Sequence, residues 1–246
     1  FSTSFKISSQ IFTTPIKWIP NPVTFSNYIK VWTEEPFLKY YINTAIVTVC
    51  ATVGQVILCA MAAYAFAKLE FIGKNFLFAC YLATMMVPWH TIMIPQYQLI
   101  SKMGLTDTRL ALILGQFASA FGVFLLRQFF MVVPNELREA AKIDGANEAR
   151  TFLKIIMPQA KPGITTLIIF TFIQVWNDYL APTIFLRSEK NWTLQVVIRS
   201  FNSYYAIQSD YALIMAASVI AMIPTMALFF IFQRMIIESI AISGIK

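Results

Sequence analysis

Long runs of apolar residues without charge dominate the pattern along this chain. Five such runs stand out, separated by polar segments that hold most of the charged residues. They cover residues 41–67, 75–101, 110–126, 162–186 and 211–233, and only the fourth contains a charge. Crossing a hydrocarbon layer about 30 Å thick takes roughly 20 residues at about 1.5 Å each. The pattern therefore predicts five membrane-spanning segments.

These runs predict helices and not strands. Each run is longer than a strand, and none alternates between polar and apolar residues as the strands of a membrane barrel do. In lipid, an α-helix satisfies its backbone hydrogen bonds within one segment. We therefore expect an all-α, polytopic integral membrane bundle. The second run carries Pro88 and Pro95 on either side of His90, the only histidine, and two prolines predict a broken helix.

Composition supports this interpretation. Hydrophobic residues make up 58% of the 246 residues and charged residues only 13%, whereas a soluble domain has about 25% charged residues. The net charge is +7, but the basic residues lie mostly between the apolar runs, and no basic stripe carries stacking aromatics. We therefore expect a lipid bilayer as surroundings and no nucleic acid as partner. Cys50, Cys59 and Cys80 all lie inside apolar runs, so neither a disulfide framework nor a metal site is expected.

Between the third and fourth runs the chain becomes charged. Residues 134–161 carry nine charged side chains, yet two sets of apolar residues keep the i, i+3, i+4 spacing of a helix face. These residues are Leu137, Ala140, Ala141, Phe152, Ile155 and Ile156. The pattern predicts a helix–turn–helix outside the membrane. Its charged surface and semi-apolar face are typical of a docking element.

The turn of this element has its own signals. Gly145 stands where a left-handed residue would end the first helix, and Asn147 is placed to cap the second. Pro158 and Pro162 are expected to close the second helix.

The same segment carries a motif of known transporters. Glu139-Ala140-Ala141 is followed by three residues, Gly145, and an Ile155-x-x-Pro158 ending. This pattern, in a charged loop between two apolar runs, resembles the EAA loop of ABC importer permeases. Further stretches resemble the carbohydrate-uptake branch, whose best-known member is the smaller membrane subunit of the maltose transporter. They are AAYAFAK at 62–68, WNDYLAP at 176–182 and the C-terminal FQRMIIESIAISGIK at 232–246.

The resemblance, which runs from about Asn43 to Lys246, implies a type I ABC importer permease fold. Such permeases normally have six spans, so we expect a first span before Phe1. The resemblance also implies a multi-pass protein of the bacterial cell membrane that is a transport subunit and not an enzyme. Charge alone leaves the orientation open, because the basic residues divide ten to nine between the two sides.

The partners implied by the resemblance are a second permease subunit, two cytoplasmic ATPase subunits, an extracytoplasmic solute-binding protein and a sugar. The chain itself is expected to hold no cofactor. It contains no Gly-x4-Gly-Lys-Ser/Thr segment, whose backbone cradles phosphates, so ATP and Mg would belong to the ATPase subunits.

The resemblance also implies that the 134–161 loop is the element that couples the permease to its ATPase. Glu139 can pair with a basic or amide group in the ATPase cleft, and Gly145 permits a sharp turn. The coupling residues expected from the motif are Glu139, Ala140, Ala141, Asp144, Gly145, Ala146, Phe152, Ile155 and Pro158.

Asp178 is the only acid inside a predicted span. A charge at the bilayer centre costs at least about 2.5 kcal/mol, so the carboxylate should face water or a partner. Its place about 24 Å along a helix from Pro162 puts it near the outer membrane face. It either lines or gates the substrate path or anchors the helix at the interface beside a base. Trp176, Asn177 and Asn43 are further path candidates, although Trp is equally common at membrane interfaces.

Three classes of function remain in view. The first is the sugar permease, with glycerol phosphate as another solute. The second is an ion-driven secondary transporter, which favours intramembrane carboxylates and inverted repeats, whereas this chain has one such acid and no visible repeat. The third is a membrane enzyme, which needs clustered catalytic groups, and no catalytic residue is expected here. Association with an ATPase discriminates between them.

Overall fold

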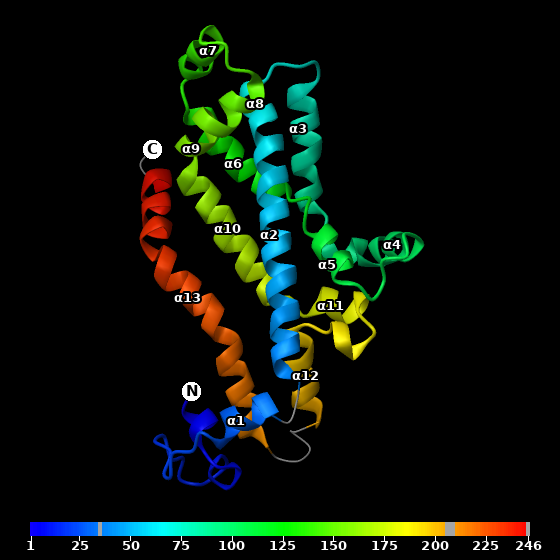
Figure 1. The fold of residues 1–246 in the computed structure, drawn as a ribbon, viewed down its shortest axis with the longest axis vertical. Helices are drawn as coiled ribbons and strands as arrows, with labels where there is room; N and C mark the ends of the chain where they lie inside the picture. Colours follow the sequence, from blue (N-terminus) through cyan, green and yellow to red (C-terminus); the bar gives the residue numbers. More distant parts are fainter. Residues whose placement is uncertain (34–35, 205–209, 245–246) are drawn as a thin grey trace.

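The computed structural model describes residues 1–33, 36–204 and 210–244, and the side chains of 202–203 and 234–244 lie outside the description. The C-terminal motif at 232–246 therefore lies almost wholly outside the described side chains. The described part is helical and forms a long, narrow bundle with the 134–161 loop at one end and the N-terminal segment at the other (Figure 1). The short N-terminal helices are η1 (Ser2–Phe5), η2 (Ser8–Gln10) and α1 (Ser26–Thr33).

Two helices are each long and apolar enough to cross a membrane. They are α2 (Phe37–Lys68) and α13 (Tyr211–Gly244), whose qualifying part is Tyr211–Gln233. Both match the runs predicted at 41–67 and 211–233. Three bent helix pairs also qualify by composition, which gives up to five spans among the described residues.

The 75–101 run is broken, as its prolines predict. Helix α3 (Lys74–Ala83) continues through the 3-10 turn η3 (Thr84–Met86), and α4 (Trp89–Lys102) follows at a bend of 101°. The break lies at Pro88 because a proline disfavours helical backbone in the residue before it, and Val87 is extended. Pro95, in contrast, lies inside α4.

The 110–126 run is also two helices. Helix α5 (Arg109–Gly115) and helix α6 (Ala120–Val132) meet at a bend of 47°. Ser119 starts the second helix, because its hydroxyl accepts a hydrogen bond from the backbone N–H of Gly122 at 3.0 Å. The polar residues Gln116 and Ser119 thus mark a helix break inside a run that hydropathy alone treats as continuous.

The prediction of one helix over 162–186 is wrong. Helix α10 (Lys161–Trp176) ends before Asp178, and the short α11 (Leu180–Phe185) follows. The Asp178 carboxylate accepts the backbone N–H of Ala181 at 3.2 Å, so the acid caps the second helix and does not continue the first. The chain then passes through η5 (Glu189–Asn191) and α12 (Leu194–Tyr204) before α13.

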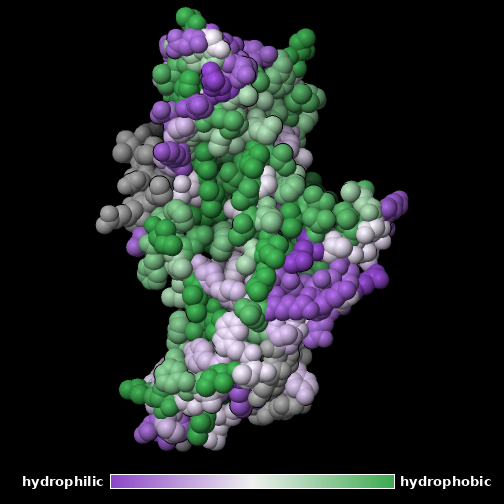
Figure 2. Space-filling view, in the orientation of Figure 1, coloured by the Kyte–Doolittle hydropathy of each residue, from purple (hydrophilic) through white to green (hydrophobic). Residues whose placement is uncertain are grey.

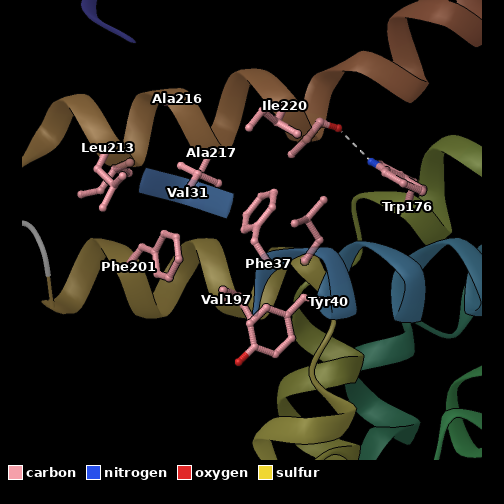
Figure 3. Close-up of a cluster of buried hydrophobic side chains, with 13 residues drawn as sticks. Val31, Phe37, Tyr40, Trp176, Val197, Phe201, Leu213, Ala216, Ala217 and Ile220 are labelled. Atoms are coloured by element: carbon pink, nitrogen blue, oxygen red, sulfur yellow. Dashed lines mark hydrogen bonds between the residues drawn. The ribbon is translucent and has the colours of Figure 1, made fainter. Parts of the chain in front are cut away.

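Helix α2 is the central element, since it packs against α6, α10, α5 and α12. Close approach is possible at Gly122 of α6, where an added Cβ would lie 2.8 Å from the sulfur of Cys59. This agrees with the close packing expected of a small residue in an apolar helix. Buried side chains gather in three clusters along α2, and Figure 3 shows the one at the end farthest from the 134–161 loop.

Figure 2 shows that hydrophobic side chains cover much of the middle of the visible face. Hydrophilic side chains gather over α7 at the top and beside α4 and α11 at the side. Many large apolar side chains on α2, α3 and α13 are exposed. An apolar surface of this size on long helices is what lipid or neighbouring membrane helices cover.

Candidate functional site

The turn of the 134–161 loop is built as its sequence predicts. Helix α7 (Asn135–Ile143) ends in a Schellman motif around Gly145, which has φ +77°. The N–H of Ala146 donates to the carbonyl of Ala141 at 2.9 Å, and the N–H of Gly145 donates to the carbonyl of Lys142 at 3.0 Å. An added Cβ at Gly145 would meet no atom within 4 Å, so the backbone conformation alone requires glycine here.

The second half of the loop is one bent helical segment. Asn147 caps α8 (Glu148–Thr151) by accepting the N–H of Arg150 at 2.9 Å. The segment continues through the π-helix η4 (Phe152–Ile156) and α9 (Met157–Gln159), and then turns by 82° into α10. Pro158 lies inside this segment, whereas Pro162 opens α10. The wider π turn interrupts the α-helical spacing that the sequence suggested.

A carboxylate braces the two halves of the loop to α2. Glu148 accepts hydrogen bonds from Arg138 (2.6 Å to Nη2) and from the hydroxyl of Tyr64 (2.7 Å), and its Oε1 lies 2.9 Å from Nζ of Lys142. Hydrogen bonds from Arg138, Lys142 and Tyr64 to the ionised form lower the pKa of Glu148 to about 2. We name this cluster of Tyr64, Arg138, Lys142 and Glu148 the loop brace. None of its four residues is among the coupling residues expected from the motif.

A second tie holds the entrance of the loop. The ammonium of Lys68, at the end of α2, donates to the carbonyl of Val133 at 2.5 Å and to Oδ1 of Asn135 at 2.8 Å. The loop is therefore fixed to α2 both before and after its turn. Each tie includes an ionised group, and such charge-assisted hydrogen bonds are stronger than neutral ones.

The motif residues mostly face outward from this frame. Glu139 is exposed and has no hydrogen-bond or ion-pair partner among the described residues. Ile143 is 87% exposed and Leu137 is 42% exposed, so the same helix also presents apolar surface. The exposed motif residues are Glu139, Ala140, Asp144, Gly145 and Pro158, while Ala146, Phe152 and Ile155 are half-buried and Ala141 is buried. Figure 2 shows hydrophilic side chains gathered at this end of the molecule.

The sequence predicted the docking face of α7 only in part. Ala141 turns inward, whereas Leu137 and Ala140 are exposed as a docking face requires. Ile143, the most exposed apolar residue of the helix, was not singled out. Its place next to Asp144 and the glycine turn is the signal that could have identified it.

The outer polar residues form a different arrangement at the far end of α10. Asp178 is half-buried, and its carboxylate accepts hydrogen bonds from the backbone N–H groups of Leu180 and Ala181, with no ion pair to a base among the described residues. Asn177 is exposed, and its amide donates to the carbonyl of Ile173 at 2.8 Å. Neither side chain is fully buried, and their place on the solute path stays a prediction. The alternative of an anchor paired with a base gains no support.

Two of the path candidates are buried and must be corrected. Trp176 is 2% exposed, stacks on Phe172 with ring centroids 5.6 Å apart, and donates its indole N–H to the carbonyl of Ala221 at 3.0 Å (Figure 3). Asn43 is 5% exposed and donates to the carbonyls of Lys190 and Trp192. In this structure neither is open to a sugar, because the indole packs against Phe172 and Tyr41 and the amide of Asn43 is already hydrogen-bonded.

Comparisons with known proteins agree with this architecture. A family profile described as the inner membrane component of binding-protein-dependent transport systems matches residues 55–242. An alginate-importing bacterial ABC transporter of known structure contains a similar chain, with a TM-score of 0.86 and 27% identity over 95% of this chain and 87% of that one.

Three relatives of known role are similar over nearly the whole chain. The diacetylchitobiose uptake permease NgcG of Streptomyces coelicolor is 33% identical over 97% of this chain and 80% of its own length. The arabinooligosaccharide permease AraQ of Halalkalibacterium halodurans is 31% identical over 99% and 88%. The sn-glycerol-3-phosphate permease UgpE of Yersinia enterocolitica is 32% identical over 94% and 85%.

Proposed function

The chain belongs to the family of binding-protein-dependent transport system inner membrane components, and from this premise we propose that it forms half of the membrane path of a sugar importer. It is an ABC permease subunit, a transport component and not an enzyme. Di- or oligosaccharides are the favoured substrates, because NgcG and AraQ are named for such sugars. The ion-driven alternative has no support from this family.

The proposed assembly contains a second permease subunit, two cytoplasmic ATPase subunits and an extracytoplasmic solute-binding protein. ATP and Mg would be held by the ATPase subunits. The chain would span the bacterial cell membrane with the 134–161 loop in the cytoplasm, where it would meet an ATPase. The family description supports the dependence on a binding protein and the membrane location, and the remaining details are part of the proposal.

One observation carries the coupling role most directly. The loop presents an unpaired carboxylate, Glu139, one turn before the exposed Ile143, on a helix whose position is fixed by the loop brace. A rigid helix that presents an apolar side chain and one unpaired charge suits a groove on another protein. Burial of the apolar surface contributes affinity, and the charge fixes the position in which the helix docks. A solvated loop would need neither the brace nor the exposed Ile143.

Reconstituted transporter in vesicles tests this role. Glu139→Gln should reduce ATP-driven uptake at least several-fold and weaken co-purification of the ATPase, while the thermal stability of the permease stays unchanged. Glu70→Gln is the matched control, because Glu70 is also exposed and lies between α2 and α3 at the same end of the molecule. Equal uptake by the Glu139 variant and the wild type would refute the role of Glu139.

Glycerol phosphate is the second candidate solute, favoured by the similarity to UgpE. Uptake assays with a disaccharide, an oligosaccharide and sn-glycerol 3-phosphate, each supplied with the cognate binding protein, distinguish the two. Uptake of glycerol phosphate alone would overturn the sugar assignment and leave the permease assignment intact.

A further inference from the structure

A basic pocket lies at the end of α2 opposite the 134–161 loop. It has a volume of about 610 Å³ and is lined by residues from the starts of α2 and α5, from η5 and from α1. Lys39, Arg109 and Lys190 supply three positive charges from three separate segments of the chain. All three side chains are exposed. We name this site the basic pocket.

The acids near these cations in the sequence are hydrogen-bonded to other groups. Asp107 is occupied by the backbone N–H groups of Arg187 and Ser188, each at 2.9 Å, and by the hydroxyl of Ser188. Glu189 accepts the hydroxyl of Tyr40 at 3.0 Å. Neither acid lines the pocket. Glu34 and Glu35, which precede Pro36 at its rim, lie outside the described residues. The described part of the pocket therefore has a positive field.

Hydrogen bonds fix the walls of the basic pocket in place. The buried amide of Asn43 donates to the carbonyls of Lys190 and Trp192 at 3.1 and 3.0 Å, which fastens η5 to α2. The same side chain accepts Nη1 of Arg109 at 3.5 Å, and Asn191 donates to the carbonyl of Asp107 at 2.5 Å. The three cations are therefore carried on a prearranged frame, which lowers the entropy lost on binding.

The basic pocket is continuous with an apolar stripe. Its lining includes Trp32, Leu38 and Ile42, all more than 40% exposed. From Ile42 the exposed stripe continues along one face of α2 with spacings of three and four residues. Its further members are Ile46, Val49, Val53, Ile57 and Met61. From Ile42 to Met61 the stripe measures about 28 Å at about 1.5 Å per residue, close to the thickness of the hydrocarbon layer.

We propose that the basic pocket binds the phosphate headgroup of an anionic phospholipid, with an acyl chain along the α2 stripe. A lipid combines the two chemistries that meet here, a phosphate at the membrane surface and a long apolar tail. Lys and Arg at this depth attract anionic headgroups, and Trp32 stands where tryptophans gather at a membrane interface. A soluble anion would use the cations but not the stripe. A partner helix would use the stripe but would leave the cations unmatched.

The leaflet is fixed by the fold. The basic pocket lies at the Ile42 end of the stripe, and the loop brace lies beyond Met61 at the other end of the same helix. The lipid therefore belongs to the leaflet on the side away from the 134–161 loop. This inference requires only that the chain spans the membrane, and it does not depend on the solute that is transported.

Native mass spectrometry of the assembled transporter tests the proposal. The complex is purified from vesicles of phosphatidylglycerol mixed equally with phosphatidylcholine, and the retained lipids are counted. Wild type should retain phosphatidylglycerol in preference. Lys39→Gln/Lys190→Gln should bind it about thirtyfold more weakly, because each of the two cations near the surface attracts an anionic headgroup by about 1 kcal/mol. Lys17→Gln/Lys102→Gln removes the same charge from exposed positions outside the basic pocket and should bind it as wild type does.

Each other outcome overturns the proposal. Equal retention of the two lipids would show no headgroup selection, and equal loss in both variants would show only a general charge effect. Displacement of the lipid by millimolar sn-glycerol 3-phosphate would assign the cations to a soluble anion. Unchanged retention in the pocket variant would mean that the retained lipid binds elsewhere on the complex. If that variant fails to assemble, Lys39→Ala and Lys190→Ala are measured singly, and Lys39→Arg/Lys190→Arg must retain the lipid.

Discussion

In the 134–161 loop the residues of the transporter motif remain largely exposed, while other residues hold the loop in place. At the break after α10 the arrangement is reversed, because two of the polar residues expected to meet the solute are themselves structural ties. Glu139 is unpaired among the described residues, whereas Trp176 and Asn43 are buried and hydrogen-bonded. Residue type alone therefore does not separate function from structure. What separates them is whether the folded chain already gives the side chain a hydrogen-bonding or packing partner.

The largest effect should follow from removing the indole of Trp176. Trp176→Ala deletes a buried side chain in the cluster of Figure 3 and the hydrogen bond to the carbonyl of Ala221, so we expect a loss of about 3–5 kcal/mol. Thermal unfolding of the purified complex measures it. Trp176→Phe should recover part of that stability and leave sugar selectivity unchanged. Altered sugar selectivity in a stable Trp176→Phe variant would indicate that Trp176 does line the substrate path.

The second-largest effect should follow from a substitution in the glycine turn. Gly145→Val places a β-branched residue at φ +77°, which costs about 1–2 kcal/mol and shifts the two halves of the loop relative to each other. ATP-driven uptake should fall strongly while membrane insertion persists. Gly145→Asn is the control, because asparagine tolerates left-handed backbone and the site has room for a side chain. Normal uptake by the valine variant would remove the turn from the coupling mechanism.

The loop brace should contribute less to the stability of the folded protein, and its contribution should depend on pH. Glu148→Gln weakens contacts with Arg138, Lys142 and Tyr64. Because the Glu148 side chain is 42% exposed, solvent screening limits the loss to about 1 kcal/mol. We expect a modest fall in thermal stability and looser coupling, measured as ATP hydrolysed per sugar imported. Glu136→Gln is a suitable comparison, since that exposed acid of the same loop forms no hydrogen bond or ion pair among the described residues.

The sign of the pH dependence follows from the pKa of Glu148. The value in the folded protein, about 2, lies below the unfolded value of about 4.3. The stabilisation is therefore fully present above about pH 4.3 and is lost as the pH falls through 2. The difference in unfolding temperature between wild type and Glu148→Gln should be constant from pH 5 to 7 and shrink below pH 4. A difference that grows on acidification would contradict the brace.

The smallest effect on stability is expected at Asp178. Asp178→Asn keeps an oxygen that can accept the N–H of Ala181, and asparagine caps helices as well as aspartate does, so stability should change by no more than about 0.5 kcal/mol. Uptake should nevertheless fall or change its selectivity if the charge lies on the solute route. A cysteine at 178, with the native cysteines removed, should react with a hydrophilic thiol reagent. Normal transport together with an inert cysteine would leave Asp178 only its capping role.

The sequence predicted those features that depend on neighbours along the chain. Hydropathy summed over about 20 residues identified α2 and α13, because the cost of placing a helix in lipid is a sum over its own side chains. Gly145 and Asn147 were identified because a turn and a cap are made by backbone groups a few residues away. The break at Pro88 followed from the missing N–H and steric bulk of proline.

Other features depend on contacts that no local pattern encodes. Glu148 meets Arg138 across a glycine turn and Tyr64 from another helix, and Asn43 meets carbonyls 147 and 149 residues away. The end of α10 at Trp176 was also missed, because the apolar run continues past it and Asp178 caps a new helix within that run.

The sequence by itself thus determined that the chain is a helical membrane protein with a charged helix–turn–helix loop, since hydrophobicity and turn chemistry are local. Only the tertiary structure decided which polar side chains are free to act. Glu139 stays exposed, whereas Trp176 and Asn43 are buried and donate hydrogen bonds to backbone carbonyls far along the chain. The side chains of Lys39, Arg109 and Lys190 line one pocket. The physical reason is that a polar group's availability depends on whether the folded chain brings it a partner, and those partners come from far along the sequence.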